Sequence, residues 1–196
     1  MKKALVLVAF FAITLFSLSA FAAPTIVDLT YIGPNGQNNG QYYTDPYYGS
    51  LDGGTTVFAM FCDDFGHEAS PGATNPYYML NGAGDLSLAR FSPLQYAEVF
   101  YLVSQFPTHT DAWIPLTQAI WDITSNAGYG DPDTLAWIAD AEANHGNVDM
   151  SQFVVFAALD KENGPQEFVA PTPEPTTLFM VGTGLLGIVS AVRKRL

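Results

Sequence analysis

The stretch "SPLQYAEVFYLVSQF", residues 92–106, marks the point at which the character of the sequence changes. Ser92 stands directly before a proline and three residues before Gln95, which is the spacing of a capping box at the start of a helix. Apolar residues then recur at helical intervals, and Pro107 is expected to end the helix. The stretch therefore predicts a helix that begins at Pro93.

Two more helices are predicted after this one. The segment "DAWIPLTQAIWDITSN", residues 111–126, reads as a helix that begins near Pro115. In "DPDTLAWIADAEANHG", residues 131–146, Asp131 is the expected N-cap, Asp133 is an acid of the first turn, and Gly146 is the stop signal. Three consecutive helices thus occupy the middle of the chain.

Strands are predicted on both sides of the helices. Residues 25–32 alternate and are rich in β-branched side chains, and "TTVFAMFCDDF", residues 55–65, is a nearly continuous apolar run. Between them lies a segment rich in Gly, Asn, Pro and Tyr that reads as a long loop or two turns. Residues 151–160 return to a strand pattern, and residues 164–170 form a last strand or an exit path. We therefore predict an α+β fold, a β-sheet or sandwich with a helical insertion of about three helices.

The start of the chain has the pattern of a secretory signal peptide. Lys2 and Lys3 precede an apolar run, and Ala20 and Ala22 form an Ala-x-Ala cleavage site. This predicts removal of residues 1–22 after recognition by the Sec export machinery. The alternative is an uncleaved N-terminal membrane anchor.

The expected exported domain, residues 23–170, is strongly acidic. Arg90 and Lys161 are the basic residues left between the two chain ends, while the chain has 19 carboxylates. Such a surface excludes nucleic acid as a partner, because phosphate binding needs clustered Lys and Arg. It suits an extracellular setting, with solubility as a simpler explanation than dedicated ion binding. Nothing in the composition calls for a cofactor.

The end of the chain, residues 171–196, contains a second apolar segment. Residues 176–192 carry no charge and would span roughly 25 Å as a helix, close to the ~30 Å of a bilayer core. Arg193, Lys194 and Arg195 follow in a basic tail, residues 193–196, and are expected to act as a membrane stop on the cytoplasmic side. The alternative is a buried core helix, which rarely lacks a polar face.

The order Pro173-Glu174-Pro175, apolar helix and Arg-rich terminus resembles the PEP-CTERM sorting signal of exported Gram-negative bacterial proteins. The resemblance implies processing by an exosortase and an association with exopolysaccharide and biofilm. It also implies a precursor anchored in the inner membrane with its domain outside the cytoplasm, which then goes to the cell surface or the extracellular space.

Two short motifs resemble those of thioester domains (TQXA-type) in bacterial surface adhesins. They are "FCDDF", residues 61–65, and "LTQAIWDIT", residues 116–124, which is one residue shorter than the usual glutamine motif. The resemblance implies a thioester between Cys62 and Gln118, open to attack by an amine or hydroxyl of a target. The alternative is that Cys62, the single cysteine, is an ordinary buried core residue.

Other signals for chemistry are weaker. "CDDFGHE", residues 62–68, lacks the second ligand group that a zinc site needs, so we expect no metal site. No nucleotide-binding or hydrolase motif is present, so we expect no catalytic residues and no enzyme activity. We expect an exported structural or interaction component of the envelope or exopolysaccharide matrix. The alternative is a covalent adhesin.

Overall fold

The computed structural model describes residues 24–172, which contain six strands and three α-helices. The strands are β1 (Thr25–Pro34), β2 (Tyr47–Leu51), β3 (Phe58–Cys62), β4 (Thr74–Asn81), β5 (Phe153–Ala158) and β6 (Phe168–Pro171). The helices are α2 (Pro93–Gln105), α3 (Trp113–Ser125) and α4 (Pro132–Asn144), followed by the short 3₁₀ turns η1 (His145–Asn147) and η2 (Met150–Gln152). The predicted α+β class and the insertion of three helices between strands are confirmed.

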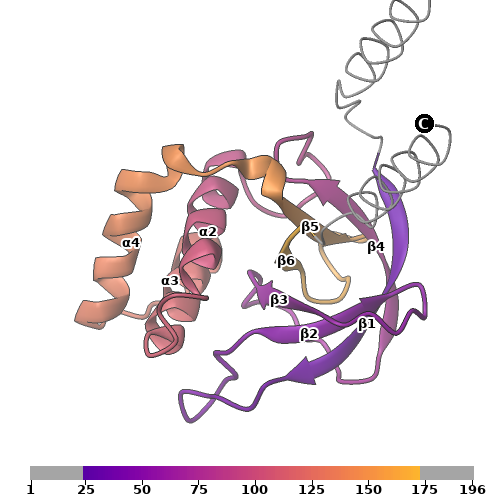
Figure 1. Ribbon diagram of the computed structural model, residues 1–196, viewed down its shortest axis with the longest axis horizontal. Coiled ribbons are helices and arrows are strands. Elements are labelled where there is room, and N and C mark those ends of the chain that lie inside the picture. The colour runs from indigo at the N-terminus through magenta and orange to yellow at the C-terminus, as the bar shows by residue number, and fades with distance from the viewer. Residues whose placement is uncertain (1–23, 173–196) are drawn as a thin grey trace, which may run out of the picture.

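The strands close into an antiparallel barrel in the order β1-β2-β3-β6-β5-β4 (Figure 1). The predicted β-sheet is thus present but closed on itself, and it is not one layer of a sandwich. Closure depends on the length of β1, whose first half pairs with β4 and whose second half pairs with β2. A register shift between Tyr31 and Gly33 bends the strand between these two partners.

β2 lies where the sequence suggested a loop or turns, and β4 lies in residues 66–91, a segment broken by Gly and Pro for which no strand was predicted. β4 contains Pro76, a residue that normally argues against a strand. Pro76 is paired with Asp28 of β1, but the pairing of β4 with β5 begins only at Tyr77. The proline therefore stands where β4 has a neighbour on one side, so its missing N–H leaves no buried partner unsatisfied.

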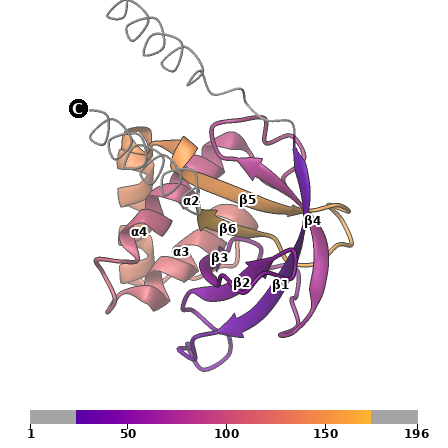
Figure 2. The same ribbon diagram turned by 45° about the vertical axis from the view of Figure 1, so that its right-hand side comes forward.

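The three helices lie together on one side of the barrel (Figures 1 and 2). α2 starts with the predicted capping box, in which Ser92 and Gln95 exchange hydrogen bonds. α3 begins at Trp113, two residues earlier than expected, with Pro115 tolerated in its first turn. α4 is capped by Asp131, which accepts a hydrogen bond from the Thr134 N–H at 3.0 Å.

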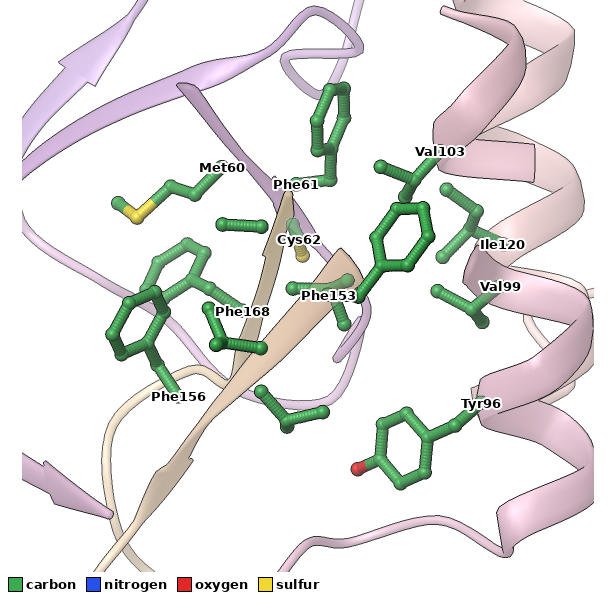
Figure 3. Close-up of a cluster of buried hydrophobic side chains, with 14 of the residues drawn as sticks. Met60, Phe61, Cys62, Tyr96, Val99, Val103, Ile120, Phe153, Phe156 and Phe168 are labelled. Carbon is green, nitrogen blue, oxygen red and sulfur yellow. The ribbon is translucent and has the colours of Figure 1, made fainter. Parts of the chain in front are cut away.

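The core has two parts, separated by β3, β5 and β6. Inside the barrel, Phe168 packs near the rings of Tyr31 and Tyr47. On the helix side, Phe100 of α2 stacks on Phe153 of β5 with ring centroids 4.8 Å apart. Figure 3 shows Phe156 and Phe168 on one side of the strands that carry Cys62 and Phe153, and Val99 and Ile120 on the helix side. β5 is buried along its whole length for this reason.

Among residues 24–172, no helix is long and apolar enough to cross a membrane. The expected signal peptide (1–22), the membrane helix (176–192) and the basic tail lie outside the described residues.

Candidate functional site

Cys62 is the last residue of β3, and its side chain is 2% exposed. It lies directly opposite Phe168, the first residue of β6. Burial, with Asp63 as the second cause, raises the pKa of the Cys62 thiol far above its ordinary value. The thiol is thus shielded from solvent and held in its protonated form.

The side chain next to this thiol is the amide of Gln166, two residues before β6. Gln166 Nε2 lies 2.7 Å from Cys62 Sγ and donates a second hydrogen bond to the Asp64 carbonyl oxygen at 3.1 Å. The N···S distance is at the short end even of N–H···O hydrogen bonds, although sulfur is larger than oxygen. The amide carbon, bonded to Nε2, is therefore held in the immediate neighbourhood of the thiol sulfur.

Gln118, the partner that the sequence motif suggested, is held elsewhere. Its Oε1 lies 3.1 Å from Thr134 Oγ1, whose single hydrogen is shared between Gln118 Oε1 and Asp131 Oδ2. Gln118 therefore ties α3 to α4. The amide that meets Cys62 is that of Gln166, because the β3–β6 register places the start of β6 beside the end of β3.

The motif of residues 116–124 in α3, called the helix motif below, contacts Cys62 through a different residue, Trp121. The Trp121 indole Nε1 lies 3.2 Å from Cys62 Sγ and 3.1 Å from the Cys62 carbonyl oxygen. Its ring packs near Phe65 and Tyr42, with centroid distances of 5.1 and 6.0 Å. Thr117 of the same motif donates from Oγ1 to the Thr44 carbonyl at 2.7 Å, which fixes this face of α3 against the barrel.

A buried ion pair holds the loop that leads to Gln166. Arg90 NH1 donates to Asp64 Oδ2 at 2.6 Å and to the Pro165 carbonyl at 3.1 Å, and its Nε donates to the Lys161 carbonyl. His67 Nδ1 lies 2.8 Å from Asp64 Oδ2, and this carboxylate raises the pKa of His67. Asp64 thus connects the segment after Cys62 to the segment before Gln166.

Two further acidic residues, Asp63 and Glu167, directly follow Cys62 and Gln166 in the chain. Asp63 and Glu167 are both fully buried, and neither carboxylate oxygen of Asp63 has a hydrogen-bond partner among the described residues. Tyr96 OH donates to Glu167. Burial raises the pKa of both carboxyls, and Glu167 reaches about 7. Burial and the repulsion between two negative charges both favour the neutral form, so at least one of these two carboxyls is expected to stay protonated.

A pocket of about 490 Å³ opens onto Gln166. Its wall is mainly aromatic, and its other polar side chains come from Gln41, from the loop after β3 and from Gln166 itself. The aromatic lining consists of Tyr31, Tyr42, Tyr43, Tyr47, Phe65 and Trp121. Much of the tyrosine-rich segment 41–48 therefore faces a pocket, which gives a small molecule or side chain a path to the Gln166 amide.

No group of three or more His, Cys, Asp or Glu side chains within residues 24–172 is arranged to hold a metal ion. The sequence analysis did not predict that Gln166 contacts Cys62, nor that Asp64 forms an ion pair with Arg90. "PQEFVA", residues 165–170, carried the usable signal: a glutamine two residues before an apolar strand. Without the strand register, that glutamine could not be distinguished from Gln118.

Comparison with known proteins identifies the end of the chain. Residues 171–195 carry a PEP-CTERM protein-sorting motif. The predicted residues Pro173, Glu174, Pro175, Arg193, Lys194 and Arg195 all fall within this match. The motif implies an exported protein that is anchored in the membrane before sorting and is processed by an exosortase.

The rest of the chain has more distant likenesses. No curated protein sequence matches the chain. A solved structure, the N-terminal thioester domain of a surface protein from Clostridium perfringens, is similar with a TM-score of 0.45 and 11% sequence identity. The similarity covers 74% of this chain and 98% of that one. A likeness of this size leaves the chemistry to be judged from the contacts around Cys62.

Proposed function

We propose that this is a surface or extracellular protein whose exported domain attaches covalently to a target through an internal thioester between Cys62 and Gln166. The observation that carries the proposal is the 2.7 Å separation of Gln166 Nε2 and Cys62 Sγ in a buried site. A thiol that served only as a core residue has no need of a side-chain amide at this distance.

The chemistry needs no oxidant, metal or cofactor. In the first step, Cys62 Sγ attacks the Gln166 amide carbon, the C–N bond breaks, and the thiol proton leaves with the nitrogen as ammonia. In the second step, a nucleophile on the target attacks the same carbon, the C–S bond breaks, and sulfur takes up the proton that the nucleophile loses. The product is a target bonded to the Gln166 side chain and a free Cys62 thiol.

Burial supports the lifetime of such a bond. Cys62 is 2% exposed, and the site is closed on one side by Trp121 and on another by the Arg90–Asp64 ion pair. Exclusion of water protects a reactive acyl group from hydrolysis until a nucleophile arrives. A target nucleophile can approach the Gln166 carbonyl carbon through the aromatic pocket.

The nucleophile is an amine or hydroxyl group that fits the aromatic pocket. The acidic surface favours positively charged targets, because it raises their local concentration and their rate of encounter. The reaction consumes the thioester once, so we propose that the protein is not an enzyme.

The sorting motif supports a place for this domain in the envelope or the exopolysaccharide matrix. In this proposal the Sec machinery exports the chain, the C-terminal helix holds it in the inner membrane, and an exosortase acts near Pro173-Glu174-Pro175. The domain then joins the matrix as a structural or interaction component. The alternative is that Cys62 stays a free thiol. The protein would then have the same location and would bind its partners without a covalent bond.

The thioester is tested by the intact mass of the purified exported domain. We expect a deficit of one ammonia in the wild type, and addition of one methylamine to that species on incubation with the amine. Gln166→Ala and Cys62→Ala should abolish both changes, whereas Gln118→Ala, the matched control, should retain them. A full mass with a freely alkylated Cys62 in the unfolded wild type would refute the thioester.

The sorting proposal has a separate test. Replacement of Glu174 by Ala should leave the protein as its membrane-bound precursor, detected by fractionation and immunoblotting. The Glu162→Ala variant, changed at an exposed position of the domain, serves as the control. Normal processing of the Glu174 variant would contradict recognition through this residue.

A further inference from the structure

The indole of Trp121 is the other donor at the sulfur. Its Nε1 stands 3.2 Å from Cys62 Sγ and 3.1 Å from the Cys62 carbonyl oxygen, so one hydrogen is shared between two acceptors. Trp121 is 2% exposed, which excludes water as a competing partner. Neither core packing nor helix formation requires the N–H to point at this sulfur.

We propose that the Trp121 N–H is a catalytic group of the Cys62–Gln166 thioester, stabilising the negative charge that develops on Sγ when the thioester forms and when it opens. The inference rests on the proposed thioester function. It assigns to the helix motif a role in chemistry that the sequence had suggested for Gln118.

The shared geometry makes the contact selective for the transition state. A thioester sulfur is a weak acceptor, so in the resting state the indole bonds mainly to the Cys62 carbonyl. As the C–S bond breaks, charge collects on sulfur, and a hydrogen bond to a charged acceptor is much stronger than one to a neutral acceptor. The N–H is already within reach and need not reorganise, so it lowers the barrier rather than stabilising the thioester.

The surroundings make this assistance necessary. Cys62 is buried, lies opposite Phe168 of β6 and shares β3 with the fully buried Met60, so a thiolate there has no water to solvate it (Figure 3). The Asp64 carbonyl is an acceptor and gives no help to a negative sulfur. After attack on the amide carbon, Gln166 no longer carries its N–H group beside Sγ, which leaves Trp121 as the donor in place.

Trp121→Phe removes the N–H and keeps an aromatic ring beside Phe65 and Tyr42. Trp113→Phe is the matched control, since Trp113 lies in the same helix and loses a comparable bond, from its Nε1 to the Phe106 carbonyl at 3.1 Å. The full chain is purified in detergent, and opening of the thioester by methylamine is followed by intact mass. We expect opening to be roughly 10- to 100-fold slower in Trp121→Phe, the range for a lost hydrogen bond to a charged group, and unchanged in Trp113→Phe.

An opening rate in Trp121→Phe within about twofold of the wild type would overturn the inference. If that variant does not fold, biosynthetic replacement of tryptophan by benzothienylalanine keeps the ring shape and exchanges N–H for sulfur. The same slowing is then expected, in a chain that carries phenylalanine at positions 113 and 137.

The inference and the thioester itself fail in different ways. A wild-type chain without ammonia loss refutes the thioester, but the contact remains testable by the NMR signal of the Trp121 indole N–H. Cys62→Ala should shift that signal and leave the Trp113 and Trp137 signals in place. An unmoved Trp121 signal would show that the indole does not bond the sulfur, and the inference would fall.

Discussion

The buried acids Asp63 and Glu167 predict an unusual dependence of stability on pH. Glu167 is fully buried, and burial raises its pKa from 4.5 to about 7 despite the hydrogen bond from Tyr96. The folded domain therefore binds more protons than the unfolded chain between these two values. By linkage, stability from this group is complete below pH 4.5 and is lost as the pH rises through about 7.

The size of the effect follows from the shift. A rise from 4.5 to about 7 corresponds to about 3 kcal/mol of unfolding free energy, lost between mildly acidic and mildly alkaline solution. His67, whose pKa is also raised, changes stability in the same direction. The carboxyls with lowered pKa, such as Asp131, act only at lower pH. The difference between wild type and Glu167→Gln isolates the Glu167 contribution from these groups.

The assay is urea unfolding of the exported domain at several pH values from 5 to 8, in a Cys62→Ala background that excludes any crosslink. Glu167→Gln should equal its parent at pH 5 within about 1 kcal/mol, because both side chains are then neutral and accept the Tyr96 bond. At pH 8 it should be the more stable of the two by up to about 3 kcal/mol. Glu162→Gln, at an exposed site, should follow the parent throughout. Parallel curves for Glu167→Gln and the parent would refute the reasoning.

Three further substitutions test the framework of the site by urea unfolding. Thr117→Val removes the buried bond to the Thr44 carbonyl and should lower the unfolding free energy by about 1–3 kcal/mol. Arg90→Met leaves the buried Asp64 carboxylate without its guanidinium partner, which should cost about 3–5 kcal/mol. A Cβ at Gly82 would lie 2.6 Å from a Phe100 ring carbon, so Gly82→Ala should cost about 1–3 kcal/mol, while Gly146→Ala, with nothing within 4 Å, should be neutral.

Local signals in the sequence were enough to predict the helices. The capping box at Ser92, the cap at Asp131 and the prolines that follow each of them act within one turn, so the prediction needs no tertiary information. β4 was missed because Pro76 argues against a strand unless one knows which side of the strand lacks a neighbour. Barrel closure was missed because it depends on β1 pairing with two different strands.

The candidate site, like the fold, could be predicted from the sequence only in part. Cys62 could be selected because it is the single cysteine of the chain, and the helix motif could be selected from its residue order. Which glutamine meets the sulfur depends on the pairing of Cys62 with Phe168, a contact across more than a hundred positions. Such a register is set by the whole barrel, and shifting it by one residue would turn the Gln166 side chain to the other face.

The position of Gln166 also bears on how a captured target would be held. Gln166 lies two residues before β6, and β6 ends at Pro171, where the match to the sorting motif begins. In the membrane-anchored precursor, a pull on a target bonded to Gln166 passes to the membrane through residues 167–172. The helices and the other strands lie outside that path. β6 pairs with β3 on one side and β5 on the other, so these two ladders resist the pull in shear. A target bonded to Gln166 would thus load β6 directly and its neighbours β3 and β5 only through these two ladders, and local opening of the helices would leave the covalent connection between target and membrane intact.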